Sequence, residues 1–258
     1  MGTIVEIAIS AKPGAPLGSR ERAFILIGEA FQEIARLEKV FSRFDPESEL
    51  SRLNGREAGT WIPGSDELNR ILALGETIER CSHGSFRLMP ECPHGPGQCY
   101  ELKDQAIKKL STCAFDLGGI AKGYIVDQVF ERLRNSAPDA KILINAGGDL
   151  RCSHEERIEL RVPGEDGDGR YSLTIQNAAL ATSSLQGSLC SVGTASARYP
   201  QNTRTDAPAL SASVVAKSCG IADAIAKVAL LGDATRAMAS DLEVGMIYLF
   251  DRQGKALT

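Results

Sequence analysis

The sequence lacks the features that would direct the protein to nucleic acid or to a membrane. Its 29 lysines and arginines are scattered, and 33 acidic residues bring the formal net charge to −4, so no basic stripe attracts a polyanion. Charges interrupt every apolar stretch well before the roughly 18 residues that a membrane span needs. No signal peptide is recognisable, because Met1-Gly2-Thr3 runs directly into the strand-like segment Ile4 to Ile9. These absences predict a cytoplasmic protein that binds neither nucleic acid nor membrane.

A cysteine framework is also missing. The seven cysteines are odd in number and have no regular spacing. Cys92 and Cys99 lie in a Pro/Gly/His-rich loop with His83 and His94 nearby, and this grouping is one that a metal site could use. However, the gap between the two cysteines is wider than in a zinc knuckle, and no second cysteine pair follows. The prediction is a plain loop with reduced thiols, as expected in a reducing cytoplasm.

What remains is an ordinary globular composition, with 43% hydrophobic and 24% charged residues in 258. This length is enough for one domain over residues 1–258, or for two intimate subdomains that share a core. The elements predicted from periodicity and turn residues are a long helix after Ser19, helices over 65–80, after 119 and over 221–230, a short helix after 230, and strands near 4–9, 114–117, 142–144, 157–162, 171–176, 211–216 and 245–250. Strands that occur in runs favour the α+β class.

The long helix after Ser19 shows the clearest periodicity. Its predicted apolar face consists of Phe24, Ile27, Phe31, Ile34, Leu37 and Phe41. The sequence turns polar over 41–55, and the segments 90–100 and 183–209 are predicted as loops.

The first segment that can carry chemistry is Asp116-Leu117-Gly118-Gly119-Ile120-Ala121-Lys122-Gly123. A carboxylate ends a predicted strand, two glycines let the backbone approach a ligand closely, and a helix begins with unpaired amides. Lys122 falls in the first helical turn, where the helix dipole disfavours a cation, so its position suggests that it neutralises a phosphate. The alternative is a tight strand-to-helix turn that carries a surface lysine. It is not a Walker loop, because no Ser or Thr follows the lysine.

Two further segments carry acids at informative positions. Asn145-Ala146-Gly147-Gly148-Asp149 again ends a buried strand with paired glycines and a carboxylate. Gly-Gly-Asp is common in ordinary turns, but two such loops could converge on one ligand. Asp223 lies inside an otherwise apolar helix, where it faces a ligand or a metal, or simply pairs with Lys227 one turn later. Taken alone, the simple pair is the better interpretation.

Together these segments resemble the ApbE-type family of FAD:protein FMN transferases. The resemblance rests on Met1-Gly2-Thr3, Phe41-Ser42-Arg43-Phe44 with Ser48 through Asn54, residues 116–124 with Asp127, residues 145–149, Leu180 through Ser183, and Ala222-Asp223-Ala224. These matches follow the order of the family over nearly the whole chain. The resemblance implies an α+β fold of the ApbE type, with mixed or antiparallel sheets and packed helices. It also implies that the protein binds FAD with Mg²⁺ on the pyrophosphate and transfers FMN to a Ser or Thr hydroxyl of a target protein, releasing AMP.

Carried over position by position, the resemblance assigns one set of ligand-binding residues and one metal-binding pair. The cofactor-binding positions are Met1, Phe44, Ser85, Phe86, Arg87, Asp116, Gly118, Lys122 and Asp149. The metal-ligand positions are Gly119, through its carbonyl oxygen, and Asp223.

The sequence departs from the family pattern at the metal and catalytic positions. Lys227 stands where the family has a threonine metal ligand, and Arg87 stands where it has an aspartate. Residues 197–203 lack the histidine that is a candidate base in the family. An ammonium group at position 227 could pair with Asp223 and take the place of the metal, since Mg²⁺ requires oxygen ligands.

Three functions are therefore open at this stage. The first is FMN transfer, or a related cleavage of the FAD pyrophosphate, with altered use of metal. The second is a flavin- or nucleotide-binding protein without catalysis. The third is a pocket that serves another heterocycle, such as a pterin.

Overall fold

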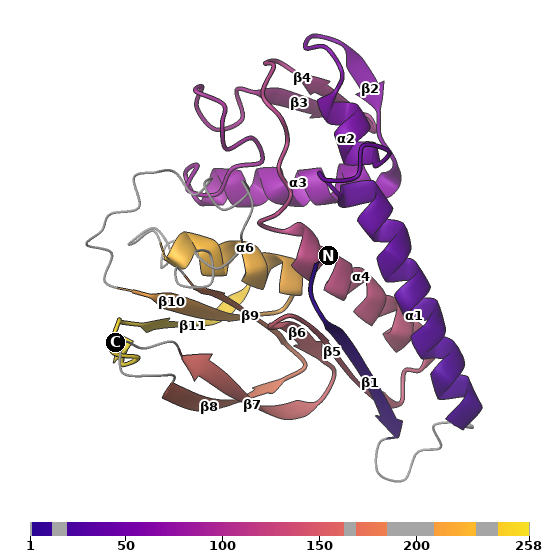
Figure 1. Cartoon of the computed structure of the whole chain (residues 1–258), viewed down its shortest axis with the longest axis vertical. Coiled ribbons are helices and arrows are strands. Elements are labelled where there is room, and N and C mark those ends of the chain that lie inside the picture. Colours follow the sequence, from indigo (N-terminus) through magenta and orange to yellow (C-terminus); the bar gives the residue numbers. More distant parts are fainter. Residues whose placement is uncertain (1, 12–19, 163–168, 185–208, 231–241, 258) are drawn as a thin grey trace.

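The computed structural model describes residues 2–11, 20–162, 169–184, 209–230 and 242–257. Its largest element is a seven-stranded antiparallel sheet with the strand order β1-β5-β6-β9-β10-β11-β12 (Figure 1). The strands are β1 (Val5–Ala11), β5 (Ala140–Ala146), β6 (Asp149–Cys152), β9 (Ala179–Ser184), β10 (Ser211–Ala216), β11 (Val244–Phe250) and β12 (Ala256–Leu257). Because β1 pairs with the distant β5, the edge of the sheet is completed by a contact between segments far apart in the sequence.

Helices cover one face of this sheet. α4 (Ala121–Ser136) and α6 (Cys219–Ala229) lie over it, and α1 (Arg20–Phe41) packs beside α4 (Figure 1). Ile142, Ile144 and Ala146 of β5 are completely buried in the main core. Their spacing of two residues places all three side chains on the helix-covered face.

The opposite face is covered by the hairpin of β7 (Glu155–Val162) and β8 (Gly169–Gln176) (Figure 1). Leu160 and Leu173 of the hairpin join Leu150 and Leu180 of the sheet in a second hydrophobic cluster. The turn predicted between these strands falls almost entirely on residues 163–168, outside the described residues. The centre of the sheet is therefore buried on both faces, by helices on one and by a hairpin on the other.

A smaller layer packs beyond α6 and α4 (Figure 1). It contains α2 (Glu49–Asn54), α3 (Asp66–Cys81) and a three-stranded antiparallel sheet of β2 (Trp61–Pro63), β4 (Ala106–Lys109) and β3 (Tyr100–Lys103). Ser48 and Ser65 begin the two helices: their hydroxyls accept hydrogen bonds from the N–H groups of Ser51 (3.0 Å) and Leu68 (3.2 Å). Such N-caps satisfy amides that the helix itself leaves unpaired.

The α+β prediction is confirmed, and several predicted elements recur with small shifts. The helix predicted over 65–80 is α3, and the strand predicted over 211–216 is β10. The helix predicted over 221–230 is α6, which begins at Cys219 because Ser218 caps it. The short helix expected after residue 230 falls outside the described residues.

The strand predicted over 114–117 is wrong. The backbone of Phe115 pairs with a side chain instead: its N–H donates to Asn54 Oδ1 (2.8 Å), and its carbonyl oxygen accepts from Asn54 Nδ2 (2.9 Å). The N–H of Asp116 donates to the carbonyl oxygen of Leu88 (2.8 Å). Asn54 and Leu88 thus satisfy the backbone groups that a neighbouring strand would otherwise pair with. Conversely, the segment predicted as a loop over 183–209 contains the end of β9, and the polar stretch over 41–55 contains α2.

The predicted apolar face of α1 is correct only in its C-terminal half. Ile34, Leu37 and Phe41 are buried, whereas Phe24 and Phe31 are 62% and 43% exposed. The buried positions earlier in the helix are Leu26 and Ala30. Periodicity finds the helix, but the neighbour that packs against it, here α4, selects which of two adjacent stripes is covered.

Every helix in the described part of the chain is too short or too polar to cross a membrane.

Candidate functional site

The Asp116–Gly123 segment forms a turn that leads into α4, as the sequence predicts, although no strand precedes it. Asp116 is held at both carboxylate oxygens. Oδ1 accepts a hydrogen bond from the N–H of Gly118 (2.9 Å), and Oδ2 accepts one from Nη1 of Arg43 (3.0 Å). The carboxylate of Asp116 is thus already satisfied by protein groups, and Arg43 is a partner that sequence reasoning missed.

Two carboxylates and two lysines gather where α4, β6 and α6 meet. Lys122 Nζ lies 2.9 Å from Oδ2 of Asp149, the first residue of β6. Lys227 Nζ forms an ion pair with Oδ1 of Asp223 one turn earlier in α6. Both aspartates are 1% exposed. The structure therefore brings together Lys122, Asp149, Asp223 and Lys227, and each carboxylate has its own ammonium partner.

Burial dominates the electrostatics of this cluster. Removal from water, followed by repulsion from the Asp223 carboxylate, raises the pKa of Asp149 to about 7, although Lys122 and Lys227 act to lower it. A carboxylate with this pKa is partly protonated at neutral pH. The four groups therefore carry no surplus of negative charge.

The N-terminus of α6 is fixed by Asp127, which follows the predicted motif. Its two carboxylate oxygens accept hydrogen bonds from the N–H groups of Cys219 (2.8 Å) and Gly220 (2.9 Å), and Arg151 pairs with it at 2.7 Å. An acid at this end also interacts favourably with the helix dipole. Asp127 thus positions the helix that carries Asp223 and Lys227.

The residues present do not fit a magnesium ion. A Cβ built on Gly119 would lie 3.6 Å from Cδ of Lys227, so the lysine stem occupies the space beside one predicted metal-ligand position. The ammonium group of the same lysine occupies the other, Asp223. Mg²⁺ requires several oxygen ligands in octahedral geometry. Within the described residues, no cluster of His, Cys, Asp and Glu has the arrangement of a metal site.

A cavity of about 570 Å³ opens at the start of the Asp116–Gly123 segment. It is lined by Arg43, Phe44, Pro46, Ser51, Asn54, Pro90, Glu91, Ala114, Phe115 and Asp116. The structure therefore brings two predicted ligand-binding residues, Phe44 and Asp116, to the wall of one cavity. The Phe44 side chain is 77% exposed. The volume of the cavity falls within the range of small-molecule sites.

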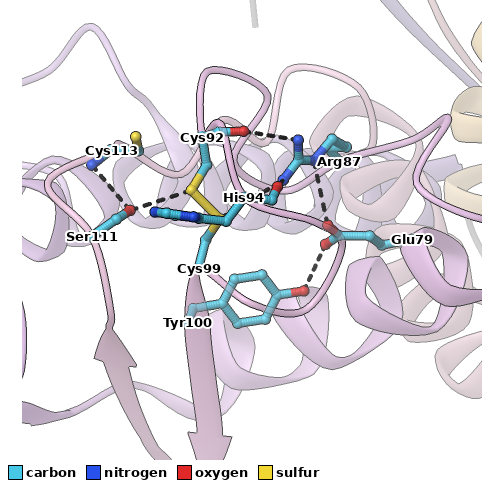
Figure 2. Close-up of a disulfide and its surroundings, with 8 residues drawn as sticks. All are labelled: Glu79, Arg87, Cys92, His94, Cys99, Tyr100, Ser111 and Cys113. Carbon is cyan, nitrogen blue, oxygen red and sulfur yellow. Dashed lines mark hydrogen bonds and ion pairs between the residues drawn. A yellow bond between two sulfur atoms is a disulfide. The ribbon is translucent and has the colours of Figure 1, made fainter.

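The predicted Ser85-Phe86-Arg87 turn divides into three different environments. Phe86 is buried, and its ring lies against Gly119, 3.0 Å from where a Cβ would stand. Ser85 is exposed. Arg87 donates hydrogen bonds to the carbonyl oxygens of Cys92 (2.8 Å) and His94 (2.5 Å) (Figure 2). The charge of Arg87, which the sequence places beside the ligand, is thus used to hold the loop that follows.

That loop is closed by a disulfide between Cys92 and Cys99, so the prediction of reduced thiols is wrong at these two positions (Figure 2). The cysteines lie in one loop that turns back on itself, and both are almost fully buried. Glu79 completes the arrangement, because it faces Arg87 Nε at 3.7 Å and accepts a hydrogen bond from the Tyr100 hydroxyl (2.7 Å). Spacing alone could not reveal this bond, since it depends on how the loop folds.

Reduction of this disulfide is expected to lower the free energy of unfolding by about 2–3 kcal/mol, because closing a short loop restricts the unfolded chain. Urea denaturation with and without a phosphine reductant measures the difference. A Cys92→Ser/Cys99→Ser variant should have the stability of the reduced protein with or without reductant. Cys81→Ser should still lose stability when the reductant is added. Equal stability in both conditions would contradict a stabilising disulfide.

The Gly147–Gly148 turn directly precedes Asp149 and packs against the N-terminal residues Thr3 and Ile4. Both glycines have positive φ, 61° and 97°, and Asn145 Oδ1 accepts a hydrogen bond from the N–H of Gly148 (3.0 Å). A Cβ on Gly147 would collide with the Thr3 hydroxyl. Glycine at 147 is therefore required by both its φ and the close approach of the first strand.

Two predicted features fall outside the described residues: Met1 and the stretch 197–203. Among the described residues, none of the three histidines forms a hydrogen bond or ion pair with the lysine–aspartate cluster. His83 is exposed, His94 belongs to the disulfide loop, and His154 pairs with Glu156 at 2.9 Å.

Comparison with proteins of known structure identifies the fold. The flavinyl transferase ApbE of Pseudomonas stutzeri superposes with a TM-score of 0.77 at 19% identity, covering 98% of this chain and 93% of that one. The flavin transferase ApbE of Vibrio cholerae gives a TM-score of 0.80 at 18% identity, covering 100% and 93%. The ApbE protein of Thermotoga maritima gives 0.77 at 17% identity, covering 99% and 93%. The predicted ApbE-like fold is confirmed.

Sequence comparison adds a shorter match and a longer one. The FAD:protein FMN transferase of Klebsiella pneumoniae (strain 342) is 44% identical over 69 residues, which are 26% of this chain and only 22% of that protein. The profile of the ApbE family matches residues 1–89 and 96–247. That match leaves out only residues 90–95, which overlap the start of the loop that the disulfide closes, and the last eleven. With both the fold and the greater part of the sequence in agreement, the chain belongs to the ApbE family.

Proposed function

We propose that the protein binds FAD and transfers its FMN part to a Ser or Thr hydroxyl of a target protein, using lysines where the family uses a metal. The observation that carries the proposal is the pairing of Lys122 with Asp149 and of Lys227 with Asp223 beside Gly119. Two ammonium groups at this turn supply positive charge where a pyrophosphate would lie against the start of α4. Three similar proteins are named FAD:protein FMN transferase, flavinyl transferase or flavin transferase, and these names support FAD as the substrate.

The reaction needs one bond to form and one to break. The acceptor hydroxyl oxygen forms a bond to the phosphorus of the FMN part, the bond from that phosphorus to the AMP oxygen breaks, and the hydroxyl proton passes to a base. Lys122 and Lys227 would bind the phosphoryl oxygens and stabilise the negative charge that develops on them. The flavin ring would lie in the cavity at Phe44, with the segment from Asp116 to Lys122 leading from the cavity to the lysines.

A second candidate is FAD binding without transfer. The lack of a histidine base supports this candidate. Among the described residues no histidine bonds to the cluster, and residues 197–203 contain no histidine. Release of AMP from FAD, followed by chromatography, separates the two functions. Sustained release together with covalent flavin fluorescence on an added acceptor protein supports transfer, whereas tight binding without AMP supports the second candidate.

Titration calorimetry with FAD tests the role of the lysines. FAD is expected to bind with the same affinity in Mg²⁺ and in EDTA, and to bind more tightly than riboflavin by a factor of roughly 10–100, since charge-assisted contacts contribute about 1.5–3 kcal/mol. Lys122→Gln should remove most of that difference by weakening FAD and sparing riboflavin. Lys103→Gln, on the exposed surface of β3, is the matched control. FAD binding that requires Mg²⁺ would overturn the substitution of metal by lysine.

A further inference from the structure

Arg43 is a partly buried arginine to which the family resemblance assigns no role. It follows the end of α1 by two residues, and its side chain is only 22% exposed. Its guanidinium contacts two predicted ligand-binding residues: Nη1 is 3.0 Å from Oδ2 of Asp116, and Cζ lies over the Phe44 ring, 4.7 Å from its centre. All three residues line the same cavity.

The hydrogen bonds at Asp116 determine which group can meet a ligand. Both of its carboxylate oxygens are already bonded, one to Gly118 and one to Arg43. Arg43 is different, because a guanidinium has five N–H donors and Asp116 is its only hydrogen-bond acceptor among the described residues. The cavity therefore presents fixed donors on a planar cation, next to an exposed aromatic ring.

We propose that Arg43 recognises the ring of the ligand by donating hydrogen bonds to the carbonyl oxygens of a planar heterocycle that lies in the cavity beside Phe44. Asp116 is the positioning residue, because its carboxylate fixes the guanidinium at the cavity wall. A planar fork of donors matches adjacent carbonyl acceptors. The inference rests on the proposed function, since the isoalloxazine of FAD is such a ring, and it assigns the selection of that ring to one residue.

Three probes separate recognition of the ring from recognition of phosphate: riboflavin, FAD and ADP-ribose. In Arg43→Met, the affinities for riboflavin and FAD are expected to fall by the same factor, roughly ten-fold or more, while the affinity for ADP-ribose stays unchanged. Arg43→Lys, which keeps the charge and loses the planar fork, should lose most of the same affinity. Arg52→Met, an exposed arginine of the neighbouring α2, should bind all three probes as the wild type does.

A double variant distinguishes recognition from mere neutralisation of Asp116. If Arg43 served only to balance that charge, Asp116→Asn/Arg43→Met would regain riboflavin affinity. We expect no such rescue, with melting temperatures showing that all variants are folded. Rescue, an unchanged riboflavin affinity in Arg43→Met, or a loss confined to FAD and ADP-ribose would each overturn the inference. These outcomes differ from failure of the proposed function, in which the wild-type protein would bind neither riboflavin nor FAD.

Discussion

Gly123→Ala is expected to lower the free energy of unfolding by about 3 kcal/mol or more, because overpacking against backbone leaves no flexible atom to move aside. A Cβ at this position would lie 2.6 Å from the carbonyl carbon of Cys219 and 2.8 Å from the nitrogen of Gly220. Both belong to the first turn of α6, so the whole helix would have to shift. Gly123 also donates from its N–H to Asp223 Oδ2 at 3.3 Å. The variant should therefore lose ligand affinity together with stability.

Gly28→Ala is the matched control, since Gly28 also lies inside a helix. A Cβ there would have no neighbour within 4 Å, so alanine is expected to stabilise the protein by roughly 0.5–1 kcal/mol through its better helix propensity. Thermal unfolding should show opposite shifts, with Gly123→Ala lowering the melting temperature by roughly 6–12 °C at this chain length. A Gly123→Ala protein as stable as the wild type would refute the close packing of α4 on α6.

Lys227→Met is expected to lower the free energy of unfolding by about 2–4 kcal/mol, because it leaves the Asp223 carboxylate buried without its cation. The estimate lies below that for a fully buried pair, since the Lys227 side chain is 22% exposed and water screens it in part. Removing both charges in Asp223→Asn/Lys227→Met should restore stability to within about 1 kcal/mol of the wild type. Urea denaturation of the three proteins measures the effect. A single variant as stable as the wild type would show that the pair has no structural role.

Lys227→Thr extends this prediction to the metal. It returns an oxygen ligand to the position that the resemblance assigns to threonine and leaves Asp223 without a cation. Millimolar Mg²⁺ is therefore expected to raise the melting temperature of Lys227→Thr, because a cation that binds only the folded state stabilises it. The wild-type protein should show no such response. A Mg²⁺-dependent rise in the wild-type protein would mean that the ion displaces the lysine, contrary to the proposed function.

Local sequence patterns predicted the regular elements because their causes are local. The helix predicted from Ser65 is α3, and the alternating apolar residues of β5 face the helices as their spacing requires. The strand predicted over 114–117 failed for the opposite reason. Its backbone partners are the side chain of Asn54 and the carbonyl of Leu88, and neither is visible from the segment itself.

The same division applies to the site. The family, the turn from Asp116 to Gly123 and the pairing of Lys227 with Asp223 could be predicted from the sequence. The pairing follows because a separation of four residues on a helix places two side chains on one face. Three contacts depend on the tertiary structure. They are the ion pairs of Lys122 with Asp149 and of Arg43 with Asp116, and the hydrogen bonds of Arg87 to the loop closed by Cys92 and Cys99. Each of these contacts joins residues whose relative positions depend on packing between separate elements. Such packing produces no periodic pattern in the sequence from which the contact could be predicted.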